Sequence, residues 1–171
     1  DDVLLIGKYK GRPSQSLPLQ NNIPIFRAAD IYLAMAEARA AQGALVYSGN
    51  DIEDLLDPAV ATQTVEGILV YLKFNRITNT AILARPNITS SQSAWKAILD
   101  ARRVEFAFEG HRYLDMKRLG IKAGSTGFDR YSKDCSVNGA CNLPATDHKL
   151  TLPIPTRELN GNTVIVEAIF Q

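Results

Sequence analysis

The chain has 171 residues, of which 46% are hydrophobic and 22% are charged, and its formal net charge at pH 7 is +1. A single folded, globular domain is typical of this length and composition. The charge provides no general attraction to nucleic acid, acidic substrates or anionic membranes, and no apolar run reaches the roughly 20 residues of a membrane-spanning helix.

The N-terminal part predicts an irregular lead-in followed by a helix rich in small residues. Glycine, proline and an Asn-Asn pair punctuate residues 1–23, which we expect to be irregular. Residues 24–120 are predicted to form a helical scaffold, whose first helix begins near Pro24 and stops at Gly43. Its apolar face consists of Ile25, Ala29, Leu33, Ala36 and Ala40. Side chains this small allow a neighbouring helix to approach closely, as in stacked helical hairpins.

Two further helices are predicted before the middle of the chain. A short helix is expected at residues 52–56, and Pro58 either ends it or starts the next one. A stronger helix is predicted for residues 64–78. Its apolar side consists of Val65, Ile68, Leu69, Leu72 and Ile77.

The next predicted helix is capped by Ser90 or Ser91. Its apolar stripe consists of Trp95, Ile98, Leu99, Arg102 and Phe106. This position favours a core role for Trp95, the only tryptophan, over a sugar-stacking role. Gly110 interrupts the helix, so the residues that follow it, up to Leu119, are predicted to form a separate helix.

The last third of the chain lacks helical periodicity. Residues 121–149 are rich in Gly, Ser, Asn and Asp and are predicted to form a long polar loop. Residues 150–171 are expected to be an extended tail, in which Thr156 can cap a single helical turn. Residues 164–170 are predicted to be extended or strand-like.

The segment ILDARRVEFAFEGHRYLDMKRLG, residues 98–120, alternates acidic and basic residues at three-residue steps. Residues three or four apart are neighbours on a helix, so each step can form an ion pair. Aromatic and aliphatic side chains lie between the charges, which indicates that the charges lie against protein and must be paired there. We therefore predict a partly buried structural ion network. Its members are Arg103, Glu105, Glu109, Arg112 and Asp115.

The same charges also admit an enzymatic interpretation. A small helical hydrolase could use Glu105, Glu109 or His111, although the neighbouring arginines would compete for the carboxylates. His111 and His148 lack the spacing of a metal motif, and the chain has no nucleophile elbow or phosphate-binding glycine loop. We therefore expect no catalytic residue, no bound metal and no cofactor.

Three blocks of the sequence resemble the SusD/RagB family of outer-membrane nutrient-binding lipoproteins. The charged segment fits R-R-x-E-(F/L)-A-F-E-G-x-R-(Y/W)-x-D-(L/M)-x-R. Residues 27–38, RAADIYLAMAEA, are similar to a helix of the family, and residues 152–160, LPIPTRELN, are similar to a block near its end. All three occur in the family's order. Asp30 and Ala101 stand where the family usually has Glu, and the chain ends without the family's Q-N-P-G-Y sequence.

The resemblance implies the all-α fold that the helices predict: antiparallel helix pairs of tetratricopeptide-like type with long irregular loops. It also implies a lipid-anchored protein at the surface of the bacterial outer membrane. Such a protein captures oligosaccharide, or in some members peptide, for a TonB-dependent transporter of the SusC type, without catalysing a reaction. Because the chain begins at Asp1 rather than Met, we expect it to be the C-terminal part of a longer protein, with the signal peptide and the lipid-bearing cysteine upstream. The main alternative function is a generic helical-repeat module that binds protein or peptide.

Three residues of the polar loop are singled out. Tyr131 is a candidate for contact with a sugar, because it combines an apolar ring face with hydrogen-bonding neighbours. Cys135 and Cys141 flank an Asn-Gly turn signal, which brings them within bridging distance. The extracytoplasmic location that the resemblance implies would keep this pair oxidised, so we predict a disulfide.

Overall fold

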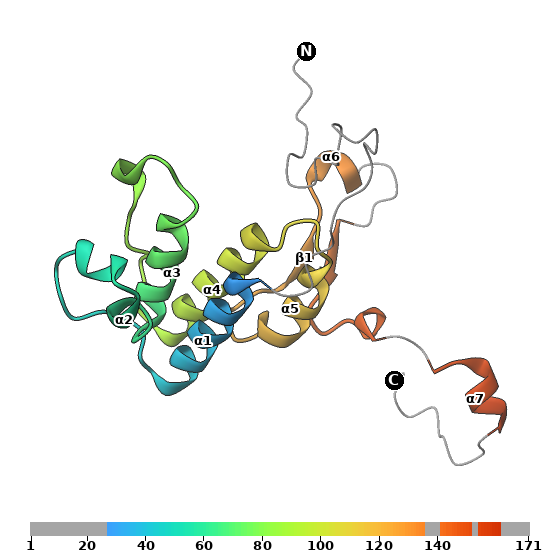
Figure 1. Ribbon diagram of the computed structural model, residues 1–171. Helices are drawn as coiled ribbons and strands as arrows, with labels where there is room; N and C mark the ends of the chain where they lie inside the picture. Colours follow the sequence, from blue (N-terminus) through green and yellow to red (C-terminus); the bar gives the residue numbers. More distant parts are fainter. Residues whose placement is uncertain (1–26, 136–140, 152–153, 162–171) are drawn as a thin grey trace, which may run out of the picture.

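The computed structural model describes residues 27–135, 141–151 and 154–161 of the chain (Figure 1). Its helical part consists of α1 (Ala28–Gln42), η2 (Glu53–Leu56), α2 (Pro58–Ala61), α3 (Val65–Phe74), η3 (Thr80–Ile82), α4 (Ser91–Glu105) and α5 (His111–Leu119). The remaining elements are β1 (Gly127–Asp129), α6 (Ser132–Cys135), β2 (Asn142–Pro144), η4 (His148–Leu150) and α7 (Thr156–Gly161). The predicted all-α fold of tetratricopeptide-like helix pairs is confirmed, with one small two-stranded sheet added.

The ends of the main helices follow from local capping. The carboxylate of Asp30 accepts a hydrogen bond from the Arg27 amide at the start of α1, and Gly43 ends the helix in the left-handed conformation, with φ of 77°. The Ser90 hydroxyl accepts a hydrogen bond from the amide of Ser93 at the start of α4. Pro24, the predicted start of the first helix, lies outside the described residues.

Helix α3 is shorter than predicted. It ends at Phe74 rather than near Thr78, because the Asn75 side-chain amide donates a hydrogen bond of 2.8 Å to the Tyr71 carbonyl oxygen and so caps the last turn. On its other side, α3 approaches α2 closely at Gly67. A Cβ atom at Gly67 would lie 2.4 Å from the carbonyl oxygen of Ala61, so only glycine fits.

The core lies where α1 packs against α3 and α4 and where α4 packs against α5 (Figure 1). Helix α1 contributes Ala29, Leu33, Ala36 and Ala40, all buried. These small side chains allow the close helix contacts that the sequence predicted. Trp95 is buried in the same core, in agreement with its position on the apolar stripe of α4.

A β-hairpin follows the helices. Strand β1 pairs antiparallel with β2, with Phe128 opposite Leu143, and Phe128 packs against the helical core. Gly127 adopts φ of 153°, and a Cβ atom there would lie 2.2 Å from the Leu143 carbonyl oxygen. The sequence predicted only a polar loop here, because strands of three residues are too short to show an alternating pattern.

The C-terminal described elements lie at the edge of the molecule. Helix α7 is separated from the helical cluster in Figure 1, and residues 164–170, predicted to be extended, lie outside the described residues. Within the described ranges, no helix is both long enough and apolar enough to cross a membrane.

Candidate functional site

Arg102 is buried where α1, α4 and α5 meet, and its side chain is 9% exposed. Its Nε atom lies 2.8 Å from Asp115 Oδ1 on α5, and its Nη1 atom lies 3.4 Å from Glu37 Oε1 on α1. Arg118 also pairs with both carboxylates, with Nη2 3.1 Å from Asp115 Oδ1 and 2.9 Å from Glu37 Oε1. We call these four residues the Arg102 cluster. It joins three helices through two cations and two anions.

A second group of charges, the Arg27 cluster, lies at the start of α1 and consists of Arg27, Arg76, Glu105 and Glu109. The Arg27 guanidinium donates to Glu105 Oε1 at 2.8 Å, to the Glu105 carbonyl oxygen at 2.8 Å and to Glu109 Oε2 at 3.2 Å. Arg76, just after α3, donates to both Glu105 carboxylate oxygens, at 2.9 and 3.2 Å. The cluster therefore connects α1, α3 and α4 to the turn before α5.

The ring of Phe106 lies between the two clusters. The Cζ atoms of Arg102 and Arg27 are 4.8 and 5.2 Å from its centroid, which is within cation–π range. His111 stacks on the same ring at 4.6 Å. The aromatic residue that interrupts the charged segment therefore separates two sets of ion pairs and contacts both.

The structure places Glu105, Glu109 and Asp115 in these clusters, but Arg103 and Arg112 outside them. Arg103 is exposed, and its nearest described carboxylate oxygen is on Asp100, 3.9 Å away. One residue along a helix is a rotation of about 100°, so Arg102 faces the core and Arg103 faces water. The Nη1 atom of Arg112 is buried without a hydrogen-bond partner among the described residues.

Local spacing could not identify the true partners, because most of them come from other helices. Glu105 and Glu109 bind Arg27, which is about eighty positions earlier (78 and 82) in the sequence. Two features of the sequence could have pointed to these arginines. Arg27 is the first residue of the first family-like block, and Arg102 lies on the otherwise apolar stripe of α4.

Two glutamates, the half-buried Glu105 and the buried Glu66, have lowered pKa values that favour the ionised form. Burial alone would raise the pKa of Glu105, but the hydrogen bond and charge of Arg76, together with Arg27, lower it below its ordinary value. For Glu66 on α3, burial also acts to raise the pKa, and the hydrogen bonds from Arg85 and the Tyr47 amide outweigh it. A carboxylate held ionised at neutral pH cannot supply a proton as a general acid.

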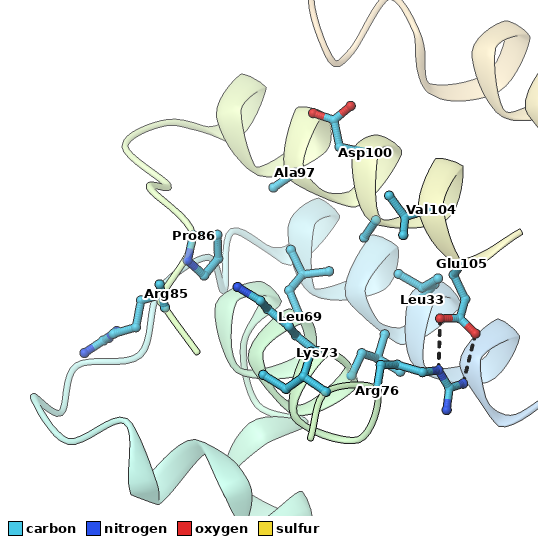
Figure 2. A pocket seen from close by; sticks show the side chains of 14 residues that line it. Leu33, Leu69, Lys73, Arg76, Arg85, Pro86, Ala97, Asp100, Val104 and Glu105 are labelled. Carbon is cyan, nitrogen blue, oxygen red and sulfur yellow. Dashed lines mark hydrogen bonds and ion pairs between the residues drawn. The ribbon is translucent and has the colours of Figure 1, made fainter. Parts of the chain in front are cut away.

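An open pocket of about 650 Å³ lies between α1, α3 and α4, with residues 84–86 at one end of its lining (Figure 2). Its apolar lining includes Leu33, Leu69, Leu72, Ala97, Ala101 and Val104. Charged side chains at its edge are Lys73, Arg76, Arg85, Asp100 and Glu105. The lining is mainly hydrocarbon, with few groups that could bind the hydroxyls of a sugar.

Arg85 fixes one end of this pocket. Its guanidinium pairs with the buried Glu66 carboxylate at 2.8 and 2.7 Å, and it also donates to the carbonyl oxygens of Tyr47 and Gly49, at 2.9 and 2.8 Å. The pairing attaches the segment after η3 to α3 and to the loop before η2.

The candidate sugar contact, Tyr131, lies between β1 and α6 and is 65% exposed. Next to it, a disulfide joins Cys135 to Cys141, with the two Cα atoms 4.8 Å apart. The Arg130 amide donates to the Cys141 carbonyl oxygen at 2.8 Å, so the bridge continues the hairpin beyond its strands. Tyr113 of α5 supports this region, because its ring stacks on Phe128.

The remaining residues considered from the sequence contribute no site. His148 is exposed beside Asp147, and His111 serves as a packing partner of Phe106. In the described part of the chain, no group of three or more His, Cys, Asp or Glu side chains is placed to hold a metal ion.

The site features described above are a helical scaffold joined by paired charges, an open pocket and an exposed tyrosine. A sequence model of the SusD family matches residues 8–170, nearly the whole chain, and the protein belongs to that family. The SusD family consists of binding proteins and is typically found at the outer membrane. No match was found among curated proteins or among solved structures.

Arg102→Ala is expected to lower the free energy of unfolding by roughly 3 kcal/mol, because the buried Asp115 carboxylate and Glu37 keep, among the described residues, only the half-exposed Arg118 as a partner. Arg103→Ala, one position along, is expected to cost less than about 1 kcal/mol, because that side chain is exposed. Urea unfolding followed by circular dichroism measures both. Equal losses for the two variants would contradict the assignment of Arg102 as the structural arginine.

Acid is expected to destabilise the protein through Glu66 and Glu105. Their pKa values are lowered in the folded state, so the stability that they contribute is present above the ordinary glutamate pKa of about 4.3 and is lost as pH falls below it. Unfolding midpoints measured at a series of pH values, from neutral pH to below pH 4, should show this decline in stability. Glu66→Gln should flatten the decline, whereas Glu53→Gln, at an exposed position, should leave it unchanged.

The disulfide predicts the number of reactive thiols in the protein. The unreduced, unfolded protein should contain no thiol that reacts with a thiol reagent. Replacing both cysteines by serine should lower the free energy of unfolding by about 2 kcal/mol, the chain-entropy value for so short a loop. Two reactive thiols per chain before reduction would refute the bridge.

Proposed function

We propose that the protein captures glycan nutrients, as oligosaccharides, at the bacterial outer membrane and delivers them to a TonB-dependent transporter of the SusC type. The observation that carries this proposal is the match to the SusD family over residues 8–170. The protein is proposed to be a surface-exposed lipoprotein whose membrane attachment is a lipid rather than a protein segment. Peptide is the other nutrient class compatible with the family.

The arrangement of charges supports a non-enzymatic role. Glu105 and Glu109, the carboxylates of the hydrolase hypothesis, both accept hydrogen bonds from Arg27. The third candidate, His111, stacks on Phe106. An acid–base pair needs one carboxyl group that retains its proton near neutral pH, and the lowered pKa of Glu105 works against this.

For the alternative function, a generic helical-repeat interaction module, the sequence offers the small-residue face of the first helix, which fits that function equally well. In the structure this face is not available to a partner, because Ala29, Ala36 and Ala40 are buried within the chain. This face is used to pack α1 on its own neighbours.

Within the proposed function, Tyr131, in the segment between β1 and α6, is the sugar contact. The ring is exposed, and the Cys135–Cys141 bridge together with the hydrogen bond from the Arg130 amide to the Cys141 carbonyl oxygen limits the conformations of this segment. A pre-shaped loop loses less entropy on binding than a flexible one.

Calorimetric titration of the purified protein with a panel of oligosaccharides tests this proposal. Tyr131→Ala should weaken binding of the preferred glycan about tenfold or more, because the stacking surface is lost. Phe108→Ala removes a similarly exposed aromatic ring outside this segment and should change the affinity little. Hydrolysis of the glycan by the pure protein, or no binding to any glycan or peptide, would contradict the proposal.

A further inference from the structure

The pocket between α1, α3 and α4 does not have the chemistry of a sugar site. Leu33, Leu69 and Leu72 form hydrocarbon walls, and Val104 on α4 exposes its side chain at the edge. An open apolar hollow of this size on a folded protein indicates a ligand, because water contact with such a surface is unfavourable. The volume of about 650 Å³ is in the range of small-molecule sites.

The charges at the edge of the pocket are not balanced. Arg76 is paired with Glu105, and Arg85 is paired with Glu66. Asp100 lies on the exposed side of α4, within 4 Å of two cations, Lys96 and Arg103.

Lys73 differs from the other cations at this edge. Its Nζ atom donates a hydrogen bond of 3.0 Å to the carbonyl oxygen of Ile82, which offers a dipole but no negative charge. Among the described residues, it has no carboxylate within 4 Å, although an ammonium group can donate three hydrogen bonds. Lys73 is on α3, on the same helix as two leucines of the wall, and Figure 2 shows it beside Leu69 in the pocket.

From this combination we propose that the pocket binds a medium-chain carboxylate, with its acyl chain against the leucines and its carboxylate on the Lys73 ammonium. The ligand class follows from the hydrocarbon lining and from Lys73, a cation at its edge without a carboxylate partner in the part of the chain that the structure describes. An oligosaccharide would leave most of its hydroxyls without hydrogen bonds against this lining. This site is separate from the loop at Tyr131 and does not depend on glycan capture.

Calorimetric titration with decanoate, below its micelle concentration, is the direct test. Saturable binding of one molecule per chain is expected, and each added methylene in a chain-length series should raise the affinity by up to roughly fourfold. Decanol has the same chain without the charge and should bind more weakly to the unmodified protein.

Lys73→Gln should weaken the binding of decanoate about tenfold and leave the binding of decanol unchanged. Because Lys73 is exposed, this variant is expected to fold normally. Lys149→Gln removes a positive charge at another exposed position and should affect neither ligand. Undiminished decanoate binding to Lys73→Gln would overturn the proposal.

Ala101→Phe places a large ring in the pocket and should abolish the binding of both ligands. The circular dichroism spectrum and unfolding midpoint of Ala101→Phe show whether this variant retains the fold. If the fold is lost, the result for Lys73→Gln decides whether the pocket binds the carboxylate. Sedimentation velocity tests whether a second copy of the chain occupies the pocket instead. A dimer that forms in the unmodified protein and is lost in Ala101→Phe would mean that a second copy fills the pocket, and would overturn the proposal.

Discussion

The structure depends on the burial of one guanidinium. Arg102 lies on the apolar stripe of α4, so packing of that stripe removes its charge from water. A buried charge is tolerated only with compensating charge and hydrogen bonds. Asp115 from α5 and Glu37 from α1 supply this charge, and the requirement fixes both helices relative to α4.

The positions of the more exposed elements follow from this arrangement. Helix α5 carries Tyr113, whose ring stacks on Phe128 and whose hydroxyl donates a hydrogen bond to the Leu150 carbonyl oxygen. The hairpin and the chain after β2 are therefore held against α5. On the opposite side, α1, α3 and α4 are connected at one end by the Arg27 cluster, and the pocket lies along the seam between them. The network that appears in sequence as possible acid–base chemistry holds together the helices that position the pocket and the segment at Tyr131.

The sequence predicted the helices well because their boundaries are local. Ser90 and Gly43 act through hydrogen bonds and backbone angles within a few residues. The ion pairs were predicted only in part, because helical spacing reports neighbours on one helix, whereas Arg27 comes from another helix. The hairpin depends on the close approach at Gly127 and on packing of Phe128, neither of which has a periodic signal. The pocket is formed by four separate segments and could not be inferred before they were assembled.

The most direct test of the central claim is a double-mutant cycle between Arg102 and Asp115, with unfolding free energies measured for Arg102→Ala, Asp115→Ala and the double variant. If the buried pair holds α4 to α5, the coupling free energy should be about 1.5–3 kcal/mol, in the upper part of the range for residues in contact. The same cycle for the exposed pair of Arg103 and Asp100 should give less than about 0.5 kcal/mol. A coupling for Arg102 and Asp115 no larger than for the exposed pair would contradict the account.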